Sequence, residues 1–192
     1  MAFRSLAPGF LIASPPLGDP NFDRTVVLLA IHNAEGALGF VVNRTAPVTV
    51  GALLRHAGYD GDHDDASPVW LGGPVQPQSG WVVVDDPSLG GEGVIEVGSR
   101  LRVSSSREAF DALAEPPPGA LVEAPRRLVV LGYSGWGPAQ LESEIARGAW
   151  LPVPLDERVL FECAPEERWE RAYALVGLKP GNMMSMRTVG EA

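Results

Sequence analysis

One serine stands where a hydrolase could carry its nucleophile. Ser134 follows the apolar run of residues 126–131, and the glycine-rich stretch of residues 132–137 around it precedes a helix-like pattern. A nucleophile elbow has the pattern G-x-S-x-G, because only small residues fit beside a serine in so sharp a turn. Trp136 occupies the last glycine position here, and all three histidines precede the serine. The sequence therefore favours a tight strand-to-helix turn in which Ser134 is a small filler residue.

His32 is the second residue that could do chemistry. It ends an apolar run beside Asn33 and Glu35. An imidazole there could act as a general base, with Asp19, Asp23 or Glu35 as its acidic partner. A lone histidine next to a hairpin turn is more often a structural hydrogen-bonding group. A hydrolase-type enzyme that uses His32 is therefore kept as an alternative, and no catalytic residue is assigned.

Arg24 and Arg44 indicate a site for an anion. Residues 25–32 and 37–43 are two apolar runs on either side of a loop that contains Asn and Gly, which is typical of a hairpin. Both arginines then lie toward the open end of that hairpin. A helix predicted to begin at Pro138 would add unpaired backbone N–H groups. The glycine spacing before it matches neither a P-loop nor a dinucleotide-binding turn.

These groups together predict a ligand-binding cleft. Its walls would be the hairpin of residues 32–44, the turn of residues 72–75, and the turn and helix of residues 132–144, with Trp136 as an apolar surface. The predicted ligand-binding residues are Arg24, His32, Asn33, Glu35, Asn43, Arg44, Gly72, Gly73, Trp136, Gln140 and Glu144. The expected occupant is a small anionic ligand or a protein partner, and no cofactor is expected.

The acidic loop of residues 60–65 resembles a calcium loop only superficially. An EF-hand loop that starts at Asp60 needs glycine at its sixth position and glutamate at its twelfth, where this chain has Asp65 and Leu71. The single cysteine, Cys163, excludes an intrachain disulfide and a cysteine-based zinc site. No metal site is expected.

The elements that must position these residues are mostly strands. Apolar runs bounded by Gly, Pro, Asn or Ser predict strands at residues 9–14, 25–32, 37–43, 69–71, 80–86, 94–97, 100–103 and 126–132. Four helices are predicted. The first covers residues 49–57 and is capped by Thr49, and the second begins with a capping box of Ser105 and Glu108. The third runs from Pro138 to about Gly148, and the last carries an apolar stripe formed by Trp169, Ala172, Tyr173 and Val176. No linker divides the chain, so one α+β domain is predicted.

Net charge and hydropathy narrow the functional class. Lys and Arg total 15 against 24 Asp and Glu, a net charge of −9. Binding to nucleic acid depends mainly on cations that displace counterions from phosphates, so direct contact with nucleic acid is not expected. Apolar runs fall well short of the roughly 18 residues that span a bilayer. We therefore expect a cytoplasmic protein that does not enter the membrane.

Several sequence blocks resemble the AlgH/YqgE family of bacterial proteins. They are residues 11–29, 32–44, 69–76, 131–145, 149–150 and 165–169, and they occur in the family's order along almost the whole chain. The resemblance implies a single domain over residues 1–192, with a bent, mostly antiparallel sheet curled into a partial barrel and helices packed outside. Ser134 stands where the family often carries alanine, which implies that its hydroxyl is dispensable.

The resemblance implies no particular reaction. Part of the family carries the label of transcriptional regulator, which implies an effect on expression without implying contact with DNA. The preferred hypothesis is therefore a non-catalytic regulatory, ligand-binding or partner-binding protein. The alternatives are a transcriptional regulator that acts on or near DNA and a hydrolase-type enzyme that uses His32.

Overall fold

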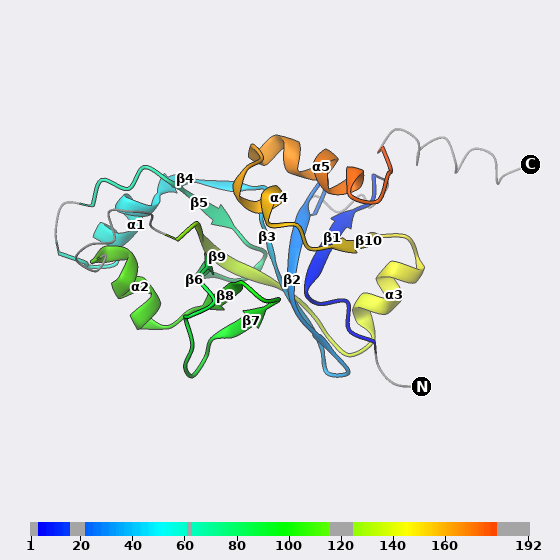
Figure 1. Ribbon diagram of the computed structural model, residues 1–192, viewed down its shortest axis with the longest axis horizontal. Coiled ribbons are helices and arrows are strands. Elements are labelled where there is room, and N and C mark those ends of the chain that lie inside the picture. The colour runs from blue at the N-terminus through cyan, green and yellow to red at the C-terminus, as the bar shows by residue number, and fades with distance from the viewer. Residues whose placement is uncertain (1–3, 16–21, 61–62, 116–124, 180–192) are drawn as a thin grey trace, which may run out of the picture.

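The computed structural model describes residues 4–15, 22–60, 63–115 and 125–179 (Figure 1). Asp19, part of the acidic loop after Asp60 and the triple proline at residues 116–118 lie outside these ranges.

One sheet organises the molecule. Its strands follow the order β10-β1-β2-β3-β9-β6-β8-β7. These strands are β1 (Gly9–Ala13), β2 (Val26–Asn33), β3 (Gly36–Val41), β6 (Val75–Asp85), β7 (Ile95–Val97), β8 (Leu101–Ser104), β9 (Arg127–Trp136) and β10 (Trp150–Pro154). Beside this path, β4 (Thr45–Thr49) pairs with β5 (Pro68–Leu71). Strand β5 runs parallel to β9, and every other pairing is antiparallel.

The sheet curls into a half-barrel. Its last strand, β7, approaches β2 across the concave side, and the main core fills the space between them. That core includes Phe10, Leu28, Phe40 and Val130, each at most 1% exposed. The predicted fold class, α+β with a bent, mostly antiparallel sheet and helices packed outside, is confirmed.

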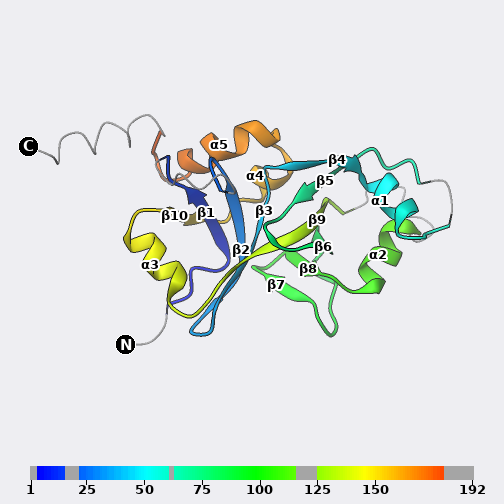
Figure 2. The same ribbon diagram turned by 180° about the vertical axis from the view of Figure 1, so that it is seen from behind.

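Helices cover the sheet from three directions. Figures 1 and 2 show α1 (Val50–His56) and α2 (Arg107–Ala114) at one end of the molecule and α3 (Gln140–Ala146) at the other. Over β1 and β2 lie α4 (Glu157–Phe161), a 3-10 turn at Pro165–Glu167 and α5 (Arg168–Ala174). The predicted apolar stripe of the last helix is correct for three of its four members. Val176 lies beyond the end of α5 and is 39% exposed.

Two predicted helix starts need correction. The side chain that caps α2 is Ser106, which accepts a hydrogen bond from the Ala109 N–H, so the cap lies one residue later than Ser105. Helix α3 begins at Gln140, because Ala139 before it has a left-handed φ of 59°. Thr49 caps α1 as predicted.

The predicted strand-to-helix turn at residues 132–137 is wrong, because this stretch continues β9. Val129, Val130 and Leu131 pair with β5, whereas Ser134, Gly135 and Trp136 pair with Gly39, Leu38 and Ala37 of β3. Gly132 lies between these two pairings with a φ of 70°, a conformation that glycine adopts at little cost. The glycine therefore kinks a long strand so that it pairs with β5 before the kink and with β3 after it, while β6 pairs on both sides of the kink.

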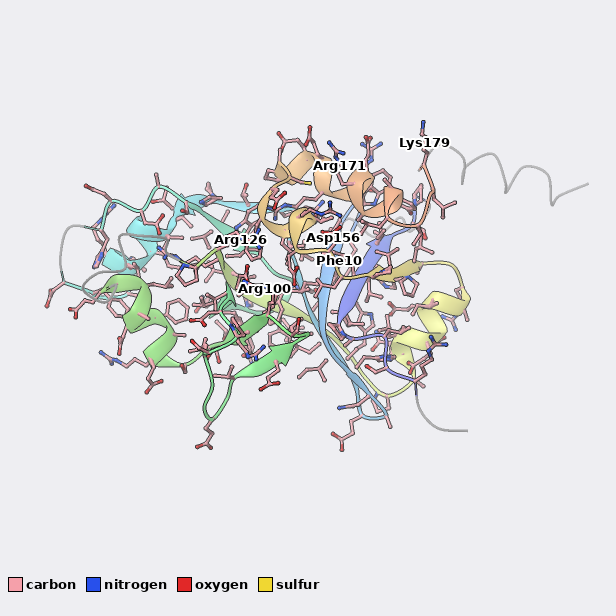
Figure 3. All side chains as sticks on the ribbon, viewed as in Figure 1. Phe10, Arg100, Arg126, Asp156, Arg171 and Lys179 are labelled. Carbon is pink, nitrogen blue, oxygen red and sulfur yellow. The ribbon has the colours of Figure 1, made fainter. Side chains whose placement is uncertain are left out.

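A buried carboxylate joins three parts of the sheet. Asp85 ends β6, and its side chain is 4% exposed. It accepts hydrogen bonds from Arg100 at 2.8 Å and Arg126 at 2.7 Å, and Figure 3 shows both arginines in the same region near α4. Burial alone would raise the pKa of Asp85, but the hydrogen bonds from Arg126 and Arg100 hold it below its ordinary value.

Strand β10 lies at one end of the strand order of the sheet, and β7 lies at the other. The whole length of β10 pairs with β1, from Ala13 opposite Trp150 to Gly9 opposite Pro154. Residues two apart in a strand direct their backbone polar groups to the same edge, and proline has no N–H. Pro152 and Pro154 therefore leave the outer edge of β10 short of donors.

Candidate functional site

The predicted site residues do not converge on one cleft, because the open end of the hairpin lies apart from its turn, whereas the turn adjoins the end of β9 and α3. Antiparallel strands keep the open end of a hairpin away from its turn by the full strand length, about 3.3 Å for each residue. Arg24, Asn43 and Arg44 lie at the open end of the β2–β3 hairpin, whereas His32, Asn33 and Glu35 lie at its turn. Gly72, Gly73, Trp136, Gln140 and Glu144 lie along β9 and α3.

The residues at the open end of the hairpin form hydrogen bonds to the backbone just before and at the start of β2. Asn43 donates to the Arg24 carbonyl at 2.8 Å and accepts from the Val26 N–H at 2.9 Å. Arg44 donates to the Asp23 carbonyl at 2.8 Å. The Arg24 guanidinium lies 5.2 Å from the ring centroid of Trp169, a residue of the main core. Arg24 and Arg44 lie at the same end of the hairpin, and the contacts described for them are with the protein itself.

His32, next to the hairpin turn, has hydrogen-bond partners on both ring nitrogens, one in the N-terminal segment and one in α3. His32 is 6% exposed. Its Nδ1 accepts from the Leu6 N–H at 2.9 Å, and its Nε2 lies 3.2 Å from Glu142 Oε1. An acceptor at Nδ1 requires a neutral ring with its proton on Nε2, which then donates to Glu142. This imidazole therefore fastens the N-terminal segment and α3 to the turn.

Gly72 and Gly73 bring bare backbone against β9. A Cβ on Gly72 would lie 2.4 Å from the Gly132 carbonyl oxygen, and one on Gly73 would lie 2.4 Å from Ser134 Oγ. Ser134 is 1% exposed and donates to the Gly72 carbonyl at 3.1 Å. The hydroxyl that raised the hydrolase hypothesis is thus a buried structural group.

Gly73→Ala is expected to lower the free energy of unfolding by more than about 2 kcal/mol. The added methyl group meets backbone atoms of Tyr133 at 2.4 Å, and the φ of 150° is unfavourable for alanine. Urea unfolding followed by circular dichroism measures the loss. Gly90→Ala is the control, because nothing lies within 4 Å of its added carbon. Equal midpoints for the two variants would contradict this role for Gly73.

Three predicted residues do share a pocket, between the end of β9, α3 and the start of β10. We call it the tryptophan pocket. It has a volume of about 440 Å³ and is lined by Phe22, Pro74, Val75, Gly135, Trp136, Gln140, Glu144, Arg147, Ala149 and Trp150.

Glu144 is the central hydrogen-bond acceptor of the tryptophan pocket. Its Oε2 accepts from both indole N–H groups, Trp136 at 2.9 Å and Trp150 at 2.8 Å. Its Oε1 accepts from Gln140 Nε2 at 2.9 Å, and Gln140 Oε1 in turn accepts from the Gly137 N–H at 3.0 Å. Residues 140 and 144 lie one turn apart on α3, so the helix places both on the same face.

Aromatic rings form the inner wall of the tryptophan pocket. The rings of Trp136 and Trp150 lie 5.8 Å apart at 82°, and those of Phe22 and Trp150 lie 5.3 Å apart at 75°. Edge-to-face contacts of this kind are favourable between aromatic rings. The two tryptophans are 7% and 3% exposed, so the pocket is built into the protein core.

Sequence reasoning missed Phe22 and Trp150. Trp150 belongs to a block that carries the family resemblance, which was the one available signal. Its place beside Trp136 depends on the pairing of β10 with β1, and no local pattern reports that pairing. Phe22 precedes β2 and shows no periodicity of its own.

Two other features bear on ligand binding. A second pocket of about 410 Å³ lies between α1 and α2, with Leu53, Tyr59, Arg107, Phe110 and Leu131 among its lining residues. Within the described ranges, no group of three or more His, Cys, Asp or Glu side chains is placed to hold a metal ion.

The fold and the site together define a class of protein. It is an α+β domain of one curled sheet, with an aromatic pocket between the end of β9, the helix α3 and the start of β10. A family model described as AlgH-like matches residues 10–181. The chain belongs to this AlgH-like family.

Individual relatives support this assignment. A UPF0301 protein of Anaeromyxobacter sp. strain Fw109-5 is 44% identical over 188 residues, which cover 93% of this chain and 92% of the relative. The solution structure of the AlgH protein from Pseudomonas aeruginosa matches with a TM-score of 0.74 at 34% identity, over 96% of this chain and 97% of that one. A crystal structure from Corynebacterium diphtheriae, with a TM-score of 0.66 at 21% identity over 89% and 87% of the two chains, supports the fold alone.

Proposed function

We propose that this protein is a non-catalytic, cytoplasmic regulatory domain that binds a small ligand or a short segment of a partner in the tryptophan pocket. The observation that carries the proposal is the pocket itself. Its volume of about 440 Å³ falls in the range of roughly 300–1,000 Å³ that is usual for ligand sites. Its polar groups are held in place by hydrogen bonds among themselves, so the site is preformed.

The chemistry of the candidate nucleophile and base supports a non-catalytic role. Both ring nitrogens of His32 already have hydrogen-bond partners, and the hydroxyl of Ser134 is buried against Gly72. A catalytic pair needs a base within hydrogen-bond reach of its nucleophile and free to accept the proton. Neither residue lines the tryptophan pocket.

Helices α2 and α3 give no support to the DNA-binding alternative. Reading a DNA groove requires a helix with several basic residues on an exposed face. Helix α3 contains two glutamates and no basic residue, and α2 contains Arg107 beside Glu108 and Asp111.

Among the helices that the structure describes, none combines the length and apolar character that crossing a bilayer demands.

The pocket can be narrowed at its wall. Ala149 lines the pocket and packs, partly buried, against the core cluster that contains Trp136 and Trp150. Ala149→Leu therefore adds apolar volume at the wall of the pocket and is expected to hinder binding. Ala66→Leu is the matched control, since Ala66 is exposed and does not line the pocket.

A thermal-shift screen of amines, carboxylates and nucleotides tests the proposal. A ligand present at about 100 times its dissociation constant stabilises by about 2.7 kcal/mol, which raises the melting temperature by roughly 5–10 °C in a domain of this size. We expect this shift with the wild type and Ala66→Leu and its loss with Ala149→Leu. A ligand that stabilises all three proteins equally would show that binding occurs elsewhere.

A further inference from the structure

We infer that the tryptophan pocket recognises a primary ammonium group, carried by a small amine or by a lysine side chain, and not the anion predicted from the sequence. This inference rests on the proposed function and names the ligand class for the same site. It follows from the charge of Glu144, from the partners that hold it and from the rings around it.

Glu144 has only neutral hydrogen-bond donors. Two indole N–H groups and one amide hold its oxygens. Across the ranges that the structure describes, no Lys, Arg or His side chain forms an ion pair with it within 4.0 Å. Neutral donors fix the orientation of a carboxylate without cancelling its charge. The Glu144 carboxylate therefore lacks a cationic partner in direct contact among the described residues.

The carboxylate also keeps room for one more donor. A carboxylate offers about four acceptor positions, and three are used by Trp136, Trp150 and Gln140. Because Glu144 lines the pocket, an occupant that brings an N–H donor and a positive charge can satisfy both the remaining position and the charge.

Aromatic walls favour the same class of ligand. A cation within about 6 Å of an aromatic ring is attracted by the negative face of the ring, and Phe22, Trp136 and Trp150 all line the pocket. Their mutual edge-to-face contacts fix the rings in place. A carboxylate among fixed rings is the arrangement expected for an ammonium group.

The groups that would have favoured an anion lie elsewhere. Arg24 contacts the Trp169 ring of the main core, and Arg44 binds the Asp23 carbonyl; neither lines this pocket. Arg147 is the one basic residue among the lining side chains, and it is exposed. The net charge of −9 also raises the local concentration of cations over that of anions.

The test uses cadaverine and glutarate, a diamine and a dicarboxylate with the same five-carbon chain. Nα-acetyl-lysine amide distinguishes a lysine side chain from a free amine, and its Nε-acetylated form is the neutral control. The indole N–H signals of Trp136 and Trp150 in a ¹H–¹⁵N spectrum report occupancy, assigned by Trp→Phe variants among the five tryptophans. We expect a charged amine to move both signals to saturation, less strongly at high salt, while glutarate and the acetylated lysine leave them in place.

Three variants sharpen this result. Glu144→Gln is expected to weaken amine binding at least tenfold, about 1.4 kcal/mol, whereas the exposed Glu170→Gln, with the same change in net charge, keeps it within about twofold. Arg147→Glu leaves the indole hydrogen bonds intact and is expected to strengthen amine binding several-fold. If Glu144→Gln does not fold, the change in amine affinity in Arg147→Glu still tests whether the charge of the pocket controls binding.

The outcomes separate the two proposals. If glutarate moves both indole signals, cadaverine does not, and Arg147→Glu abolishes the response, the ligand class is overturned while the proposed function stands. If Arg147→Glu weakens amine binding, the role given to the pocket charge is wrong. If neither the amines nor glutarate move either signal, and no screened ligand is lost in Ala149→Leu, both proposals fail.

Discussion

Glu144→Ala is expected to lower the free energy of unfolding by about 3 kcal/mol, because it leaves two indole N–H groups without an acceptor. An unsatisfied buried donor costs roughly 1–3 kcal/mol, and Trp136 and Trp150 are 7% and 3% exposed. Water that enters the pocket would satisfy part of this need, so the expected loss lies below the sum of two full penalties. The melting temperature should fall by roughly 6–12 °C for a domain of this size.

Urea unfolding followed by tryptophan fluorescence measures this loss. Gln140→Ala is the matched control, because it removes an exposed partner of the same carboxylate and leaves both indole hydrogen bonds in place. We expect Gln140→Ala to change the free energy of unfolding by at most about 0.5 kcal/mol. Equal losses in the two variants would show that the indole hydrogen bonds contribute nothing to stability.

Asp85→Asn is expected to cost about 2–4 kcal/mol at pH 7, since it removes the charge that two arginines share. The carboxylate is buried, while the Arg100 and Arg126 side chains are 53% and 43% exposed, so water limits the cost to the lower part of the range for buried pairs. The loss should appear as a lower urea midpoint with an unchanged slope.

The direction of the Asp85 pKa shift determines how the stability difference between the wild type and Asp85→Asn changes with pH. The hydrogen bonds from Arg126 and Arg100 outweigh burial and hold the pKa of Asp85 below its ordinary value in the folded protein. A carboxyl group of this kind stabilises the fold at a pH above its unfolded pKa of about 3.9, and the stabilisation is lost as the pH falls through the folded pKa. The wild type and Asp85→Asn should therefore differ at pH 7 and converge as the pH falls through the lowered pKa of folded Asp85.

An exposed pair supplies the comparison for Asp85. Arg107 and Asp111 lie 3.7 Å apart on α2, with side chains 84% and 50% exposed, and such pairs contribute little to stability. Asp111→Asn should unfold at nearly the wild-type midpoint at every pH. A pH-independent difference between Asp85→Asn and the wild type would contradict the role of the carboxylate charge.

Local patterns in the sequence were sufficient for the hairpin and for the helix α1. The apolar runs on either side of Asn33 and Gly36 predicted the pairing of β2 with β3, and Thr49 marked the start of α1. Each of these signals lies within a few residues of the structure that it specifies, and turn and cap chemistry act over that distance.

Features that depend on the order of strands were not available from such patterns. Gly132 was predicted to end a strand, because a glycine that kinks a strand and a glycine that ends one give the same pattern in the sequence. The meeting of Trp136 with Trp150 requires β10 to pair with β1 and β9 to pair with β3. The three-way contact of Asp85 joins residues 15 and 41 positions apart. Long-range pairing, which no single window reports, determines all three.

The two prolines of β10 have a consequence for how these molecules behave at high concentration. An unprotected sheet margin can template the addition of a strand from another chain, and fibres grow in this way. Pro152 and Pro154 withhold the donors that such growth needs, so crowding should not drive these molecules to polymerise through that side of the sheet. The outward carbonyl groups of Pro152 and Pro154 can still accept hydrogen bonds, so a contact there relies on side chains more than ordinary strand pairing does, and side chains can be selective for a partner.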